Sequence, residues 1–177
     1  MKNLSRLFLI AIAVIGGIIT SNAQWIHTSG LEGRTVTCFA VIDSNLFAGT
    51  DDGIFLSIDK AVSWMAVNSG LTNTNVSSLV VTSAGLLAGT RGGGVFLSAN
   101  GGASWVPMNS GLPDMDVLTV GSSGFNTLFA GTNGLGLFRS INLGSTWVQS
   151  AFTGRKVYAI AVNGANVYCA VQTIGVV

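Results

Sequence analysis

Short apolar runs alternate with small polar turn residues at a nearly constant interval from Trp25 to Val177. The stretch LFAGT at Leu46–Thr50 returns as LLAGT at Leu86–Thr90 and LFAGT at Leu128–Thr132, with a fainter copy, VYCAV, at Val167–Val171. The glycines of the first three copies are 40 and 42 residues apart. The four tryptophans keep the same interval, with spacings of 39, 41 and 42 residues. The chain is therefore predicted to be a tandem repeat of units of about 40 residues.

The pattern inside each unit predicts four short β-strands. The first strand is an apolar run (TVTCFAV, NVSSLVV, DVLTVG or KVYAIAV), the second is the LFAGT stretch, the third is GIFLS, GVFLS or GLFRS, and the fourth begins at each tryptophan. Turn sequences such as DSN and DDG separate the strands. Because the first strands are nearly continuous apolar runs, both faces of each small sheet are expected to be covered. Such sheets packed face to face around an axis form an all-β fold, the β-propeller.

The N-terminal segment has a different pattern, typical of a secretory signal peptide. Lys2 and Arg6 precede a 13-residue apolar run, Leu7–Ile19, and small residues follow at Ser21 and Ala23. The run is shorter than the roughly 20 residues of a membrane-spanning helix. We predict a signal peptide at 1–23, secretion to the periplasm, cell surface or medium, no membrane span after cleavage, and propeller blades at 24–177. The predicted repeat units are 32–71, 72–112, 113–154 and a partial unit at 155–177.

The number of blades leaves two alternatives. Propellers have 4–8 blades, and about four are present in this sequence. In the first alternative the sequence is a fragment cut within a blade, so the ring is incomplete, two apolar blade faces are exposed, and the isolated chain aggregates or self-associates. In the second, residues 25–29 supply the last strand of the fourth blade and close a four-bladed ring.

A recurring polar frame connects the third and fourth strands. The three copies read SIDKAVSW, SANGGASW and SINLGSTW, and the positions that they share are Ser57, Asp59 and Trp64; Ser98, Asn100, Gly102 and Trp105; and Ser140, Asn142, Gly144 and Trp147. The Asp or Asn side chain is expected to accept hydrogen bonds from backbone N–H groups in a tight hairpin. The glycines permit positive φ, whereas the first copy has Ala61 there. The tryptophan is expected to pack over the turn and lock the hairpin to its sheet.

This frame resembles the Asp-box, or BNR repeat, of sialidase-like and sortilin-like propellers, and the longer pattern is similar to exported photosystem-assembly-factor-like propellers. The resemblance extends over nearly all of residues 25–177. It implies a structural role for the box at the blade periphery, away from the face that binds ligands. It also implies an exported propeller that acts as a binding or scaffold module for a glycan or a protein. The alternative is part of a sialidase-like or xyloglucanase-like glycoside hydrolase.

Most charged residues of the mature chain fall in the loops before the first strand and between the second and third strands, which are expected to share one face. We predict that Arg34, Arg91, Asp116 and Arg155 bind the ligand there. A glycoside hydrolase needs two facing carboxylates, for which the candidates are Asp51 or Asp52 opposite Asp114 or Asp116.

Composition excludes several other classes. Only 8% of residues are charged and the formal net charge is +1, which is unlike a nucleic-acid-binding protein. His27 is the sole histidine. The sequence therefore lacks the residues for a Ser-His-Asp triad in the loops and for a metal site with several histidine ligands. No metal or cofactor is expected. Cys38 and Cys169 lie in distant copies and are expected to be free, small, buried residues.

Overall fold

The computed structural model describes residues 28–173 and 175–177, so the predicted signal peptide, Trp25 and His27 lie outside the described residues. Within this part of the chain no helix is long and apolar enough to cross a membrane. The strands are β1 (Val36–Ile42), β2 (Asn45–Thr50), β3 (Gly53–Ser57), β4 (Met65–Ala66), β5 (Val76–Thr82), β6 (Gly85–Thr90), β7 (Gly94–Ser98), β8 (Val106–Pro107), β9 (Val117–Ser123), β10 (Thr127–Thr132), β11 (Leu137–Ser140), β12 (Val148–Ala151), β13 (Val157–Asn163), β14 (Asn166–Val171) and β15 (Gly175–Val176).

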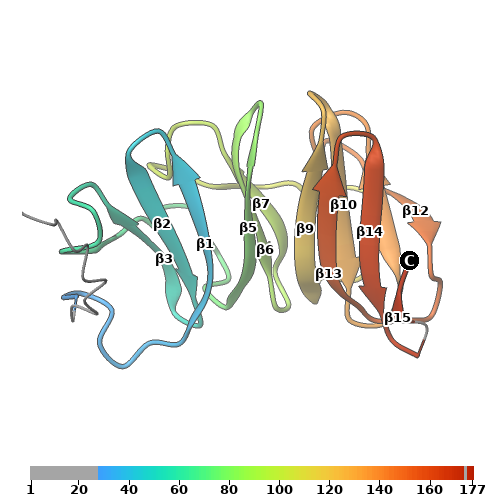
Figure 1. Ribbon diagram of the computed structural model, residues 1–177, viewed down its shortest axis with the longest axis horizontal. Helices are drawn as coiled ribbons and strands as arrows, with labels where there is room; N and C mark the ends of the chain where they lie inside the picture. Colours follow the sequence, from blue (N-terminus) through green and yellow to red (C-terminus); the bar gives the residue numbers. More distant parts are fainter. Residues whose placement is uncertain (1–27, 174) are drawn as a thin grey trace, which may run out of the picture.

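These strands form sheets of antiparallel neighbours in chain order, and each sheet is one blade. Blade 1 is β1–β4, blade 2 is β5–β8, blade 3 is β9–β12, and blade 4 is the three-stranded sheet β13–β15. The first strands of successive blades contact one another, β1 with β5, β5 with β9 and β9 with β13. Figure 1 shows the sheets standing side by side, with blades 1 and 4 at opposite ends. The described part of the chain is therefore an all-β propeller, as the repeat predicts, and its ring is open, as in the first of the two alternatives.

Three apolar clusters hold the blades together, one at each blade-to-blade interface. Phe47 of blade 1 packs with Leu79 and Phe96 of blade 2, and neither phenylalanine is more than 1% exposed. The equivalent clusters lie between blades 2 and 3 and between blades 3 and 4. Alternate side chains of each strand therefore point to opposite neighbours, so one blade serves two clusters.

Burial of the first strands differs between the middle and the ends of the arc. In β9, five of seven residues are buried, which agrees with the expected coverage of both faces. In β1 and β13 only one residue each is buried, although their sequences are as apolar as that of β9. The expectation that both faces of every sheet are covered is thus wrong for the end blades, because each lacks a neighbour on one side among the described residues.

The polar frame after each third strand folds as a hydrogen-bonded turn. The Ser98 hydroxyl accepts a hydrogen bond from the Gly102 N–H at 2.8 Å and donates one to Asn100 Oδ1 at 3.0 Å. Asn100 Oδ1 in turn accepts from the Ser104 N–H at 2.9 Å. The same bonds recur around Ser140 and Asn142. The predicted hydrogen bonds from backbone N–H groups to this side chain are therefore present.

The first copy of the frame forms the same turn with a carboxylate and without the glycine. Asp59 accepts hydrogen bonds from the Ser63 N–H at 2.9 Å and the Ser63 hydroxyl at 2.6 Å. Ala61 takes the glycine position with a φ of 67°, where Gly102 and Gly144 have 87° and 85°. A side chain at positive φ is strained, so this copy keeps the geometry at a conformational cost that the other two avoid.

The tryptophans of the frame lie between blades, and the Trp147 ring also lies beside Gly144 of its own turn, where an added Cβ would be 3.6 Å from Trp147 Cζ2. Trp105 is 3% exposed, belongs to the cluster between blades 1 and 2, and donates from Nε1 to the Val67 carbonyl of blade 1 at 2.7 Å. Trp147 makes the same bond to the Met108 carbonyl of blade 2 at 2.7 Å. The expectation that each tryptophan packs over its own turn is incomplete, because the indole also reaches the outer strand of the preceding blade.

Acidification is expected to weaken the first turn selectively. Hydrogen bonds from the Ser63 hydroxyl and N–H lower the pKa of Asp59 from 3.8 to about 2. A carboxylate whose pKa falls on folding contributes stability above its unfolded pKa and loses it as the pH falls through the folded value. We expect the unfolding free energy of the wild type to fall more steeply than that of Asp59→Asn between pH 5 and pH 2. Urea unfolding at each pH measures this, and parallel curves would contradict it.

The two cysteines are free, as expected. Cys169 is buried and Cys38 is partly buried. Burial raises the pKa of both thiols, so the reactive thiolate is disfavoured at neutral pH. Both side chains act as packing residues.

Candidate functional site

The loops that carry most of the charges meet along one edge of the arc. In each blade the residue after the second strand donates its N–H to the carbonyl of the residue before the first strand. These bonds are Asp51 to Thr35 (3.1 Å), Arg91 to Asn75 (2.8 Å), Asn133 to Asp116 (2.9 Å) and Gln172 to Lys156 (2.9 Å). The repeat thus places a pair of polar side chains at the same end of every blade, and this edge is called the loop face below.

Buried threonines close the loops between the second and third strands. Thr50, Thr90 and Thr132 are fully buried, and their hydroxyls donate to the carbonyls of Gly53, Gly94 and Gly136 at 2.9, 2.9 and 3.0 Å. These bonds explain the threonine that ends each LFAGT stretch. They hold the adjacent side chains, among them Arg91, in position at the loop face.

A polar groove of about 520 Å³ opens at the loop face beside β5 and β9. Its lining residues are Thr37, Asn75, Val76, Ser77, Arg91, Asp116 and Leu118. The groove therefore draws on blades 1, 2 and 3. Its lining includes one cationic side chain, Arg91, and one anionic side chain, Asp116.

Arg91 and Asp116 form the charged pair of this groove. Arg91 Nη1 lies 3.7 Å from Asp116 Oδ1, and the two side chains are 47% and 34% exposed. Asp116 Oδ2 accepts a hydrogen bond from Asn133 Nδ2 at 2.6 Å. Asp116 Oδ1 is buried and accepts no hydrogen bond. The pair thus combines a half-exposed guanidinium with a carboxylate whose buried Oδ1 faces that guanidinium.

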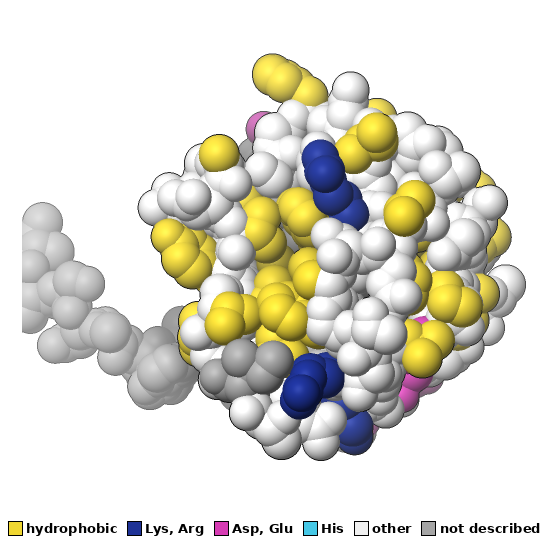
Figure 2. All heavy atoms as spheres, turned by 90° about the vertical axis from the view of Figure 1, so that its right-hand side faces the viewer, with side chains coloured by type: hydrophobic (Ala, Val, Ile, Leu, Met, Phe, Trp, Pro, Cys, Tyr) yellow, Lys and Arg dark blue, Asp and Glu magenta, His cyan; other side chains and the backbone are white. Residues whose placement is uncertain are grey.

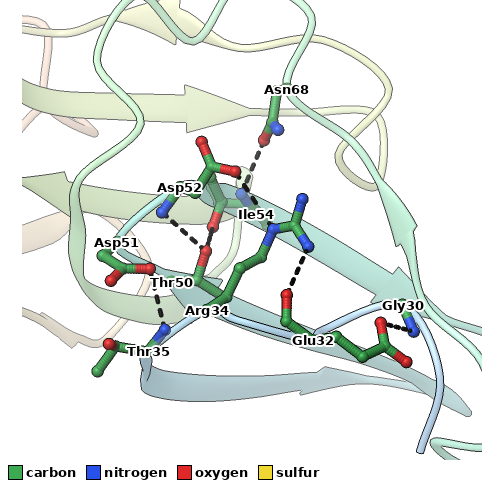
Figure 3. A network of polar contacts seen from close by, with 10 residues as sticks. Gly30, Glu32, Arg34, Thr35, Thr50, Asp51, Asp52, Ile54 and Asn68 are labelled. Atoms are coloured by element: carbon green, nitrogen blue, oxygen red, sulfur yellow. Dashed lines mark hydrogen bonds and ion pairs between the residues drawn. The ribbon is translucent and has the colours of Figure 1, made fainter.

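Arg34 belongs to a separate network at the end of blade 1 (Figure 3). Its Nε lies 3.2 Å from Asp52 Oδ2, and its guanidinium carbon lies 4.7 Å from the centroid of the Phe55 ring. Asp51 Oδ1 accepts a hydrogen bond from the Thr35 N–H at 3.0 Å. Hydrogen bonds from Thr35 lower the pKa of Asp51. Arg34, Asp51 and Asp52 are therefore engaged within their own blade.

Arg155 is likewise held within blade 4. Its Nη1 donates to the Gln172 carbonyl at 3.3 Å and to the Thr173 hydroxyl. Asp114 Oδ1 accepts from the Asp116 N–H at 3.0 Å and thereby forms the turn that leads into β9. Of the residues predicted to bind a ligand, Arg91 and Asp116 are brought together, whereas Arg34 and Arg155 each stay in a separate contact network.

The hydroxyl residues of the groove were not predicted from the sequence. Thr37 donates to the Val76 carbonyl at 2.7 Å, and Ser77 donates to the Val117 carbonyl at 2.6 Å, so each joins one blade to the next. The sequence did contain a signal, because both are hydroxyl residues at the second position of an otherwise apolar first strand. Their partners are backbone groups of another repeat, which no spacing within one unit indicates.

Metal chemistry finds no support among the residues that the structure describes. No group of three or more His, Cys, Asp or Glu side chains is close enough to hold a metal ion there. The polar groups of the loop face are hydroxyls, amides, arginines and the carboxylates described above. Such groups are suited to hydrogen bonding of a ligand.

Comparison with known proteins supports the fold. No family model matches the chain, and no curated protein matches it. Among solved structures it is similar to an ancestral GH74 enzyme (TM-score 0.62, 22% identity), to YCF48 bound to a D1 peptide (0.62, 16%) and to the extracellular domain of BT4673 from B. thetaiotaomicron (0.64, 21%). The similarity covers 77%, 80% and 84% of this chain but only 22%, 49% and 21% of those chains. At these identities the likeness shows the propeller fold alone.

Proposed function

We propose that the chain is an exported propeller module that binds a protein segment or a glycan in the groove of its loop face. The observation that carries the proposal is the Arg91–Asp116 pair. Arg91 is half exposed and the Asp116 side chain is 34% exposed, so both line the groove with part of their polar surface accessible. Backbone amides and sugar hydroxyls are the groups that complement such donors and acceptors.

Two further features support an exported binding module. The N-terminal segment has the charged start, apolar core and small-residue site of a signal peptide. The hydrogen-bonded turns at Asp59, Asn100 and Asn142 are consistent with the Asp-box that the sequence resembles, and they lie at the strand ends away from the groove. One structural neighbour is an extracellular domain, and another is a complex with a peptide. These neighbours are compatible with the proposal, and the peptide complex suggests peptides as one ligand class to test.

A glycoside hydrolase is the second candidate, because the fold neighbours include GH74 enzymes. Hydrolysis needs two carboxyl groups across the scissile bond, one of them with a raised pKa. The pKa of Asp51 is lowered, Asp52 is paired with Arg34, and Asp114 supports a turn. These contacts suit structural or binding roles, so binding is the better supported function.

Substitution in the groove tests the proposal. We expect Arg91→Gln and Asp116→Asn to weaken binding of the best ligand from peptide and glycan arrays at least about tenfold, because each removes a charge-assisted hydrogen bond. Lys60→Gln is the matched control, since this exposed lysine lies in the turn after β3, at the other end of the strand from the loop face. Unchanged affinity in both groove variants would refute the assignment.

A further inference from the structure

Blade 1 exposes a sheet face that is buried in every other blade. The first residue of the inner strand is Val76, Val117 or Val157 in blades 2, 3 and 4, and each is 0% exposed, whereas Val36 of blade 1 is 36% exposed. Phe39 is 57% exposed, but Leu79, its equivalent in blade 2, is 8% exposed. In blades 2–4 these positions are covered by the preceding blade. The exposed face of blade 1 therefore has the apolar composition of a blade-to-blade interface, but no preceding blade covers it among the described residues.

Blade 4 exposes the complementary face. Tyr168 of β14 is 45% exposed, while the equivalent Phe47, Leu87 and Phe129 are 0%, 0% and 7% exposed. Beside Tyr168 lies an apolar hollow of about 210 Å³ lined by Ala159, Ala161, Ala170 and Val176 among others. Figure 2 shows apolar side chains gathered in a depression at the end of the molecule where blade 4 lies. In blades 1–3 this face is covered by the following blade.

The two exposed faces are the two halves of a contact that the chain makes three times internally. In each internal cluster a residue equivalent to Tyr168 packs with a residue equivalent to Phe39: Phe47 with Leu79, Leu87 with Val120, and Phe129 with Ile160. We propose that blade 4 of one copy docks against blade 1 of a second copy, head to tail. Two arcs of four blades then close a ring of eight, which is within the range of known propellers.

The proposed contact differs from the internal interfaces at one packing position. At each internal interface a glycine on the second strand admits the valine of the next blade, and a Cβ at Gly131 would lie only 2.7 Å from Val157 Cγ1. Blade 4 has Ala170 in place of this glycine. Its neighbour on β13 is Ala159 where the other blades have Cys38, Ser78 or Thr119. Ala159 removes the contact of the added methyl group with its cross-strand neighbour, whereas the incoming Val36 of the second copy has to shift to make room for that methyl group.

Trp64 provides an independent observation. Trp105 and Trp147 donate from Nε1 to the outer strand of the preceding blade, whereas Trp64 Nε1 is buried and has no hydrogen-bond partner among the residues that the structure describes. Gly30 lies against the Trp64 carbonyl as Gly70 and Gly111 lie against those of Trp105 and Trp147. Gly30 therefore contacts blade 1 as Gly70 and Gly111, which follow the fourth strands of blades 1 and 2, contact the next blade.

Analytical ultracentrifugation of complementary variants tests the contact. We expect the purified protein to have twice the mass of one chain at micromolar concentration. Phe39→Asp and Tyr168→Lys are each expected to raise the dissociation constant more than about 30-fold, because each places a charge in the centre of a buried apolar contact. An equimolar mixture of the two variants is expected to recover the dimer, since one interface is then unaltered and the other pairs the introduced carboxylate with the introduced ammonium group. Phe125→Asp, at an 83% exposed position in the β9–β10 turn, is the matched control.

Three results would overturn the proposal. A monomer at all concentrations would mean that the chain covers these faces itself or leaves them open. Association that survives both substitutions would place the contact elsewhere. Loss of association in Phe39→Asp alone would indicate a symmetric contact between two copies of blade 1. Recovery of the dimer in the mixture excludes misfolding as the cause of the loss, and circular dichroism of each variant checks the same point.

Discussion

Trp105→Ala is expected to lower the free energy of unfolding by about 3–5 kcal/mol, the range for removing a buried Trp side chain from a core. The indole is 3% exposed and belongs to the cluster between blades 1 and 2. Its loss opens a cavity and also leaves the Val67 carbonyl without the hydrogen bond from Nε1. Urea unfolding followed by circular dichroism measures the change.

The matched comparisons use the other copies of the same residue. Trp147→Ala is expected to resemble Trp105→Ala, because Trp147 is equally buried and makes the equivalent bond to Met108. Trp64→Ala is expected to cost less than about 2 kcal/mol in dilute protein, since Trp64 is only partly buried and its Nε1 has no partner. Equal losses for all three tryptophans would show that contacts between blades are not the source of the effect.

Gly131→Ala is expected to cost about 1–3 kcal/mol by overpacking the interface between blades 3 and 4. A Cβ at this position would lie 2.7 Å from both Thr119 Cγ2 and Val157 Cγ1. Neither neighbour can move freely, because Thr119 is 7% exposed and Val157 is 0% exposed. The substitution thus tests whether close approach of the blades, and not turn formation, explains the glycine of the LFAGT stretch.

Two further variants make the glycine experiment specific. Gly134→Ala, in a turn where an added Cβ meets no atom within 4 Å, is expected to change stability by no more than about 0.5 kcal/mol. Thr119→Ala is expected to restore part of the stability lost in Gly131→Ala, because the double variant reproduces the Ala159–Ala170 pair of blade 4. A Gly131→Ala protein as stable as the wild type would disprove the packing argument.

The candidate site could be predicted only in part. The repeat placed charged loops on one face, and two of the predicted ligand-binding residues, Arg91 and Asp116, do meet there. Their meeting depends on adjacent blades, since Arg91 follows β6 and Asp116 precedes β9. Arg34 has a closer partner within its own blade in Asp52. Loop charges pair with whichever opposite charge the backbone brings near, and for Arg34 and Arg155 the nearest polar groups belong to the same blade.

The sequence by itself determined the repeat, the strands and the turns. LFAGT, the polar frame and the apolar first strands specify local hydrogen bonds and alternation, and these act within about 40 residues. Only the tertiary structure decided which neighbour each surface meets. It placed the tryptophans between blades, left Val36 and Tyr168 exposed at the ends of the arc, and joined Arg91 to Asp116 across a blade boundary. The physical reason is that equivalent residues have identical local signals, so their burial and partners depend on whether another blade lies beside them.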